Sequence, residues 1–83
     1  MDSKLKKIKE AIAPEMEKIN VVVDSVEWVK ENNYNNLYIV LDSTEVLDID
    51  KIVEATNIIN PIIDELDLIS EEYVLDISSK ERG

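Results

Sequence analysis

The chain has 83 residues, of which 45% are hydrophobic and 34% charged, and it contains no cysteine or histidine. This composition predicts one globular domain and excludes disulfides, a Cys–His catalytic pair and the usual ligands of structural zinc. The formal charge of −10, from 19 acidic and 9 basic residues, repels phosphate backbones and favours either a basic protein partner or solubility alone.

Apolar residues recur at every third or fourth position in residues 3–19, which predicts an amphipathic helix. The stripe comprises Leu5, Ile8, Ile12, Met16 and Ile19. Ser3 is predicted as the N-cap and Asn20 as a left-handed residue at the helix end. Pro14 lies inside the pattern and predicts a kink or a break.

Two strands are predicted at 21–30 and 37–42, because both segments are rich in β-branched and aromatic residues. The asparagines of residues 31–36 supply turn chemistry and positive φ without glycine, so the strands should pair as an antiparallel hairpin. Asp24 breaks the apolar alternation of the first strand. The second strand places Leu37, Ile39 and Leu41 on one face and Tyr38 and Val40 on the other.

A second helix is predicted over residues 49–64, with Asp48 as its N-cap and Leu47 packed against Ile52 across that cap. Its predicted apolar stripe comprises Ile49, Ile52, Val53, Thr56, Ile59 and Ile63. Residues 73–78 alternate as a third strand. One face of this strand carries Tyr73, Leu75 and Ile77, and the other carries Val74, Asp76 and Ser78.

The order α-β-β-α-β predicts an α+β fold in which two helices pack on one face of a three-stranded mixed sheet. A strand–helix–strand crossover is right-handed, which makes the third strand parallel to the second. The pattern leaves open whether the third strand lies beside the first or the second. We favour the first strand in the middle.

Five segments carry a resemblance that covers nearly the whole chain. They are V-V-V-D-S-V-E-W-V-K-E at 21–31, L-Y-I-V-L-D at 37–42, D-I-D at 48–50, D-E at 64–65 and Y-V-L-D-I-S-S at 73–79. In this order and spacing they resemble the N-terminal domain of the RimP family of ribosome maturation factors. The resemblance implies that residues 1–83 form a single domain of this kind, without the β-barrel that follows it in the family.

The resemblance departs from the family after Ser79. The family continues with Pro-Gly and an acidic–arginine pair, whereas this chain continues with K-E-R-G at 80–83. Arg82 stands nearest to the family's arginine.

The resemblance also implies a non-enzymatic assembly factor that acts on the small ribosomal subunit precursor and binds a basic small-subunit ribosomal protein. We expect a cytoplasmic monomer that uses no cofactor and no metal, and no stretch reaches the ~20 apolar residues that span a membrane. Nothing in the sequence supplies a base or a metal around carboxylate pairs such as Asp64 and Glu65, so these pairs do not indicate catalysis.

Two alternatives remain open at this point. A KH-like RNA-binding module has a similar element order but needs a Gly-x-x-Gly loop, and the only glycine is Gly83, so direct nucleic-acid contact by this domain alone is not expected. The other alternative is a scaffold domain with no separate activity.

Acidic residues within otherwise apolar strands point to a partner-binding surface. The predicted partner-binding residues are Asp24, Glu27, Asp76, Ser78, Ser79 and Arg82. The competing interpretation is that these residues face solvent on an uncovered sheet face. Trp28 and Tyr73 are predicted to pack locally rather than to anchor a partner.

Overall fold

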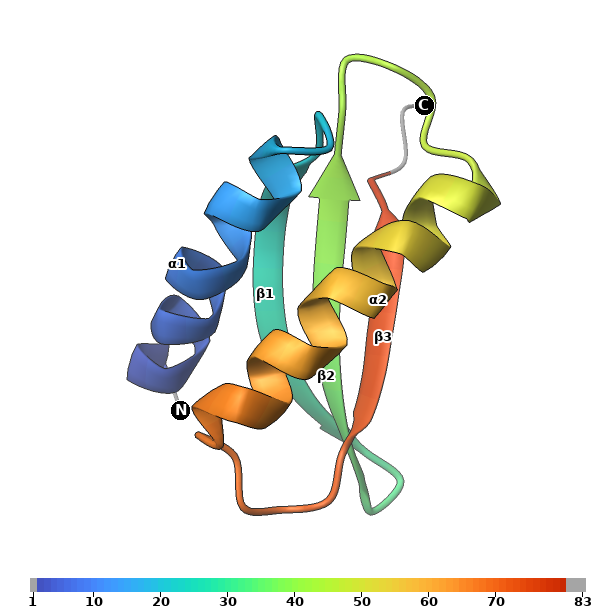
Figure 1. The fold of residues 1–83 in the computed structure, drawn as a ribbon. Helices are drawn as coiled ribbons and strands as arrows, with labels where there is room; N and C mark the ends of the chain where they lie inside the picture. The colour runs from blue at the N-terminus through green and yellow to red at the C-terminus, as the bar shows by residue number, and fades with distance from the viewer. Residues whose placement is uncertain (1, 81–83) are drawn as a thin grey trace.

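The computed structural model describes residues 2–80, which form two helices and three strands. In chain order these are α1 (Asp2–Glu17), β1 (Val22–Glu31), β2 (Tyr34–Asp42), α2 (Ile49–Leu66) and β3 (Val74–Ser79). Figure 1 shows both helices on the same face of the sheet. The predicted α+β fold is therefore confirmed, and the opposite face of the sheet, here called the open face, carries no helix.

The central strand of the sheet is β2, which pairs with β1 antiparallel and with β3 parallel. The predicted direction of β3 is correct, but the expectation that β1 lies in the middle is wrong. Three side chains of β2 are completely buried, at Leu37, Ile39 and Leu41, whereas β1 buries Val23 alone. The strand with the most continuous apolar face buries most apolar surface, and so gains most stability, when it has a neighbour on each edge. Here that strand is β2.

A β-bulge explains why Asp24 interrupts the apolar alternation of β1. The pairing with β2 jumps from Val23 to Ser25, so Asp24 is the extra residue. Because this residue shifts the alternation by one position, Val23 and Val26 both lie on the helix-covered face and Val22 lies on the open face.

The hairpin turn is tighter than predicted. It consists of Asn32 and Asn33, with φ angles of 49° and 68°, and β2 begins at Tyr34. A two-residue turn with positive φ at both positions matches the right-handed twist of the strands that it joins. The asparagines therefore supply positive φ as predicted, but only two of them form the turn.

In α1 the predicted stripe is confirmed, because Ile8, Ile12 and Met16 are completely buried. The helix begins at Asp2, so Ser3 lies inside it and is not the N-cap, and it continues through Pro14 to Glu17. Asn20 has a φ of 62°, as expected for a left-handed residue beyond the helix end.

The Asp48 N-cap of α2 is confirmed: its carboxylate accepts a hydrogen bond of 2.9 Å from the backbone N–H of Lys51. The predicted stripe is only partly correct. The face that packs on the sheet centres on Ala55 and Ile59, while Ile49 and Val53 are exposed. Figure 1 gives the reason: α2 starts beside the edge of the sheet near β3 and crosses it diagonally, so its first turn has little sheet beneath it.

Candidate functional site

The open face of the sheet is organised in rows of side chains that run across the three strands. One row is formed by Glu27, Tyr38 and Asp76, which are paired neighbours on β1, β2 and β3. The next row is formed by Ser25, Val40 and Ser78 in the same way. The central position of β2 thus brings residues from two strands far apart in the sequence onto one surface.

Tyr38 lies between acidic side chains on this face. Partial burial of the ring raises the pKa of Tyr38 above the ordinary value of 10.0, and the nearby carboxylates of Glu31 and Asp76 raise it further. A side-chain hydrogen bond with Glu31 acts in the same direction. The neutral phenol O–H donates a hydrogen bond to the Glu31 carboxylate, and the charge at the centre of the open face comes from the surrounding carboxylates.

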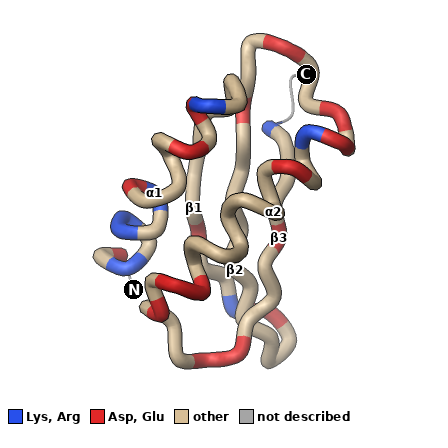
Figure 2. Tube along the Cα trace, viewed as in Figure 1, with Lys and Arg blue, Asp and Glu red and all other residues tan. Residues whose placement is uncertain are grey.

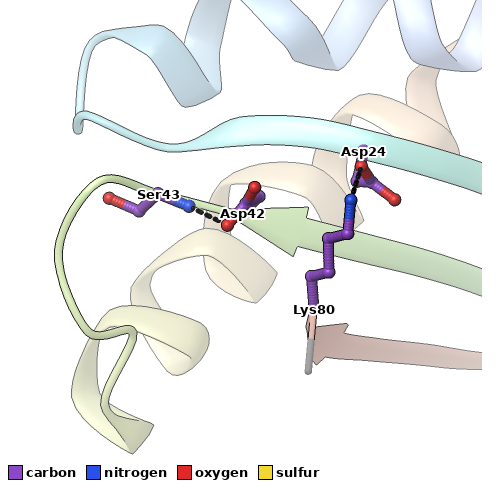
Figure 3. A network of polar contacts seen from close by, with 4 residues as sticks. All are labelled: Asp24, Asp42, Ser43 and Lys80. Atoms are coloured by element: carbon purple, nitrogen blue, oxygen red, sulfur yellow. Dashed lines mark hydrogen bonds and ion pairs between the residues drawn. The ribbon is translucent and has the colours of Figure 1, made fainter. Parts of the chain in front are cut away.

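An ion pair crosses one end of the open face, as Figure 3 shows. The Nζ atom of Lys80, which follows β3, lies 3.2 Å from Oδ1 of Asp24 on β1. The backbone N–H of Lys80 donates a 2.7 Å hydrogen bond to the carbonyl of Leu41, which holds the chain against β2 at this point. Because both side chains are partly exposed, the pair adds little stability, and Asp24 remains accessible to a competing cation.

Exposed apolar side chains accompany these carboxylates. Val22, Tyr34 and Val74 are all exposed, and the strand register places Val22 and Val74 on the open face. Figure 2 shows acidic positions on the strands, in the loops and along α2, whereas basic positions are densest in the first half of α1. Apolar and acidic groups together are suited to a basic protein surface rather than to a phosphate backbone.

Four of the six predicted partner-binding residues are brought together on the open face: Asp24, Glu27, Asp76 and Ser78. Ser79 is not on the open face, because it pairs with Leu41, whose side chain is in the core. Ser79 instead lines a hollow beside the loop that follows β2. Arg82 lies outside the described residues.

Sequence reasoning missed Tyr38 and Lys80 as members of this surface. The alternation of β2 placed Tyr38 opposite the core residues, but only the central position of β2 puts it between Glu27 and Asp76. No local signal marks Lys80, because its partner Asp24 lies 56 residues away in the chain.

Among residues 2–80, no group of three or more acidic side chains is arranged to hold a metal ion. No helix in the same range is long and apolar enough to cross a membrane.

Comparison with known families matches residues 11–80 to the RimP N-terminal domain. The match begins within α1 and runs to the residue after β3, so it includes every strand and the whole of α2. RimP proteins are ribosome maturation factors and are not known as enzymes. The fold, its element order and this match agree, and the chain belongs to the RimP N-terminal domain family of ribosome maturation factors.

Proposed function

We propose that this domain assists maturation of the small ribosomal subunit in the cytoplasm by docking a basic small-subunit ribosomal protein on its open face. The observation that carries the proposal is the row of Glu27, Tyr38 and Asp76. This row spans all three strands and places one carboxylate on each side of an aromatic ring. Family membership supplies the ribosomal context.

The chemistry of this row is suited to lysine and arginine side chains. The carboxylates of Glu27 and Asp76 can pair with ammonium or guanidinium groups, and the ring of Tyr38 offers a flat surface on which a guanidinium can stack. The net charge of −10 would attract a basic partner from a distance and raise the association rate, an effect that salt screens.

The proposal can be tested by titrating the chain with individual basic small-subunit ribosomal proteins at about 0.05 M and about 0.3 M salt. The Glu27→Gln/Asp76→Asn variant should weaken binding about 10-fold, which corresponds to roughly 1.4 kcal/mol. The matched control is Glu10→Gln/Glu17→Gln, which removes the same charge from exposed positions on α1. This control should stay within about two-fold of the unmodified chain.

Two results would contradict the proposal. Equal weakening by both variants would mean that net charge alone attracts the partner. Binding of small-subunit RNA by this chain at physiological salt, without binding of any ribosomal protein, would favour the RNA-binding alternative. That outcome would need a mode other than a Gly-x-x-Gly clamp, because residues 2–80 contain no glycine.

A further inference from the structure

A second surface lies at the start of α2, away from the open face. Val46 in the preceding loop and Ile49 and Val53 in the helix are 93%, 78% and 51% exposed. Their spacing of three and four residues places Ile49 and Val53 along one side of the helix start, with Val46 leading into it. These three residues are here called the α2 patch.

Folding of the domain does not explain the α2 patch. The helix already buries Ala55, Ile59 and Ile63 against the sheet, and the patch points elsewhere. A single exposed valine or isoleucine is ordinary, but adjacent large apolar side chains at helical spacing form a surface that water disfavours. Such a surface is typical of a contact with another molecule.

Carboxylates border the α2 patch. Glu45 precedes Val46 in the loop, and Asp50 and Glu54 follow Ile49 and Val53 in the helix, all three being exposed. Asp50 and Glu54 are four residues apart, so their like charges repel on one side of the helix. Asp50 also lies in the first turn of α2, where a carboxylate stabilises the helix, so the net cost to the helix is small. The three carboxylates complement a basic partner.

A preformed hollow adjoins the patch. It has a volume of about 240 Å³ and lies between the loop after β2 and the end of β3, with Val46 and Leu47 on one side and Ser79 and Lys80 on the other. Ligand pockets usually have volumes of about 300–1,000 Å³, so this hollow is better sized for a single side chain than for a cofactor.

The buried side chain of Ser43 fixes the shape of the loop that forms the hollow. Its hydroxyl donates a 2.9 Å hydrogen bond to the carbonyl of Asn20 and accepts one of 3.2 Å from the backbone N–H of Glu45. These two hydrogen bonds tie the loop to the turn between α1 and β1, which reduces the ordering that binding at the hollow requires.

We propose that the α2 patch and the adjoining hollow form a second docking site, which binds a basic amphipathic segment of a partner protein. One apolar side chain of that segment enters the hollow, others cover Ile49 and Val53, and its lysines or arginines pair with the bordering carboxylates. Charge complementarity selects this occupant. Binding of a second copy of the chain is disfavoured, because two molecules that each carry a net charge of −10 repel one another.

This site adjoins the open face at Lys80, which lines the hollow and also pairs with Asp24, so its test uses residues on either side of Lys80 to distinguish the two surfaces. The probe is a synthetic helical peptide that carries leucine on one side and lysine on the other, added to the isotope-labelled chain. Two control peptides replace either leucine by serine or lysine by glutamate. The leucine–lysine peptide should shift the backbone amide signals of residues 43–54 and 79–80, and neither control peptide should do so.

Variants locate the binding energy. Val46→Ser/Ile49→Ser should weaken peptide binding about 10-fold, because it removes two apolar contacts. The matched control is Val22→Ser/Val74→Ser, which changes two valines of the open face that are 58% and 54% exposed, and it should stay within about two-fold. Glu27→Gln/Asp76→Asn should also leave peptide binding within about two-fold, which separates this site from the proposed function.

Three outcomes would overturn the second site. In the first, the peptide shifts mainly the amide signals of open-face residues. In the second, Val22→Ser/Val74→Ser weakens peptide binding as much as Val46→Ser/Ile49→Ser does. The third outcome is a concentration-dependent shift of residues 46–53 without peptide, which would assign the patch to self-association. Thermal unfolding of each variant verifies that it folds, as expected for substitutions at exposed positions.

Discussion

The indole ring of Trp28 and the phenol ring of Tyr73 lie with their centroids 5.8 Å apart and their planes inclined by 56°. Trp28 belongs to the edge strand β1, and Tyr73 immediately precedes the opposite edge strand β3, so the contact reaches across β2. Both residues pack against the buried core beneath the helices, which confirms that they pack locally as the sequence predicted. The pair links the two outer strands through side chains where no backbone pairing is available.

Replacing Trp28 by alanine should therefore destabilise the domain by about 2–3 kcal/mol, less than for a fully buried tryptophan because its ring is half-buried. Urea unfolding followed by far-ultraviolet circular dichroism measures the change without relying on tryptophan fluorescence. Tyr34→Ala is the control, since Tyr34 is exposed, and it should cost less than about 0.5 kcal/mol. A loss at Trp28 no larger than this control would show that the ring contact does not hold the strands.

Stability should fall in alkaline solution because of two tyrosines. Burial raises the pKa of Tyr73, with a further increase from Asp64, and the pKa of Tyr38 is raised by partial burial and by Glu31 and Asp76. The folded state thus holds these protons more tightly than the unfolded state, whose tyrosines ionise near 10.0. Their contribution to stability is fully present below about pH 10 and is lost as the pH rises through the folded-state values.

Urea unfolding between about pH 9 and 11.5, followed by Trp28 fluorescence, measures this dependence. The Tyr38→Phe/Tyr73→Phe variant should lose less stability over this range than the unmodified chain, because phenylalanine does not ionise. Subtracting the two curves removes the contribution of lysines that titrate in the same range. Parallel curves would contradict the prediction.

The ion pair between Lys80 and Asp24 should matter more for binding than for folding. Lys80→Met should change the free energy of unfolding by less than about 1 kcal/mol, as for other exposed pairs. The same substitution frees the Asp24 carboxylate, so it should strengthen the docking of a basic protein on the open face by about two- to five-fold. Calorimetric titration measures this change.

Lys18→Met is the matched control, because Lys18 also makes an exposed ion pair, with Glu15 on α1. It removes the same charge at a distance from the open face and should improve binding by less than Lys80→Met. An equal gain from both variants would attribute the effect to net charge and would remove Asp24 from the docking surface.

The hairpin turn depends on the backbone conformation of Asn33, whose φ is 68°. Asn33→Ala should lower the free energy of unfolding by about 1 kcal/mol, because alanine lacks the side-chain amide that lets asparagine tolerate positive φ. Asn33→Gly should maintain or raise the free energy of unfolding, because glycine adopts positive φ readily. Asn57→Ala makes the same chemical change inside α2 and should be neutral or slightly stabilising. A similar effect of alanine at positions 33 and 57 in thermal unfolding would contradict this account.

Local patterns determined much of this fold. The stripe of Ile8, Ile12 and Met16 identified α1, and the alternation of Leu37, Ile39 and Leu41 identified β2. These predictions succeeded because helix and strand periodicity, capping and turn chemistry depend on neighbouring residues. The same patterns supported the family resemblance that the match over residues 11–80 confirms.

Local patterns predicted the wrong buried side chains at two places, one changed by a single bulge residue and the other by the direction in which α2 crosses the sheet. The bulge at Asp24 reverses which β1 residues face the core, and the diagonal path of α2 exposes Ile49 and Val53 although their spacing suits a buried stripe. Both features depend on contacts with elements elsewhere in the chain, so no window of the sequence contains them.

The sequence by itself determined the identity and order of the elements, the acidic character of the domain and its family. Only the tertiary structure decided that β2 is central and that Tyr38 therefore lies between Glu27 and Asp76. It also paired Lys80 with Asp24 and placed the α2 patch in solvent. The physical reason is that strand order and helix crossing are set by the burial of the whole apolar surface at once, whereas helix and strand periodicity are set by each segment alone.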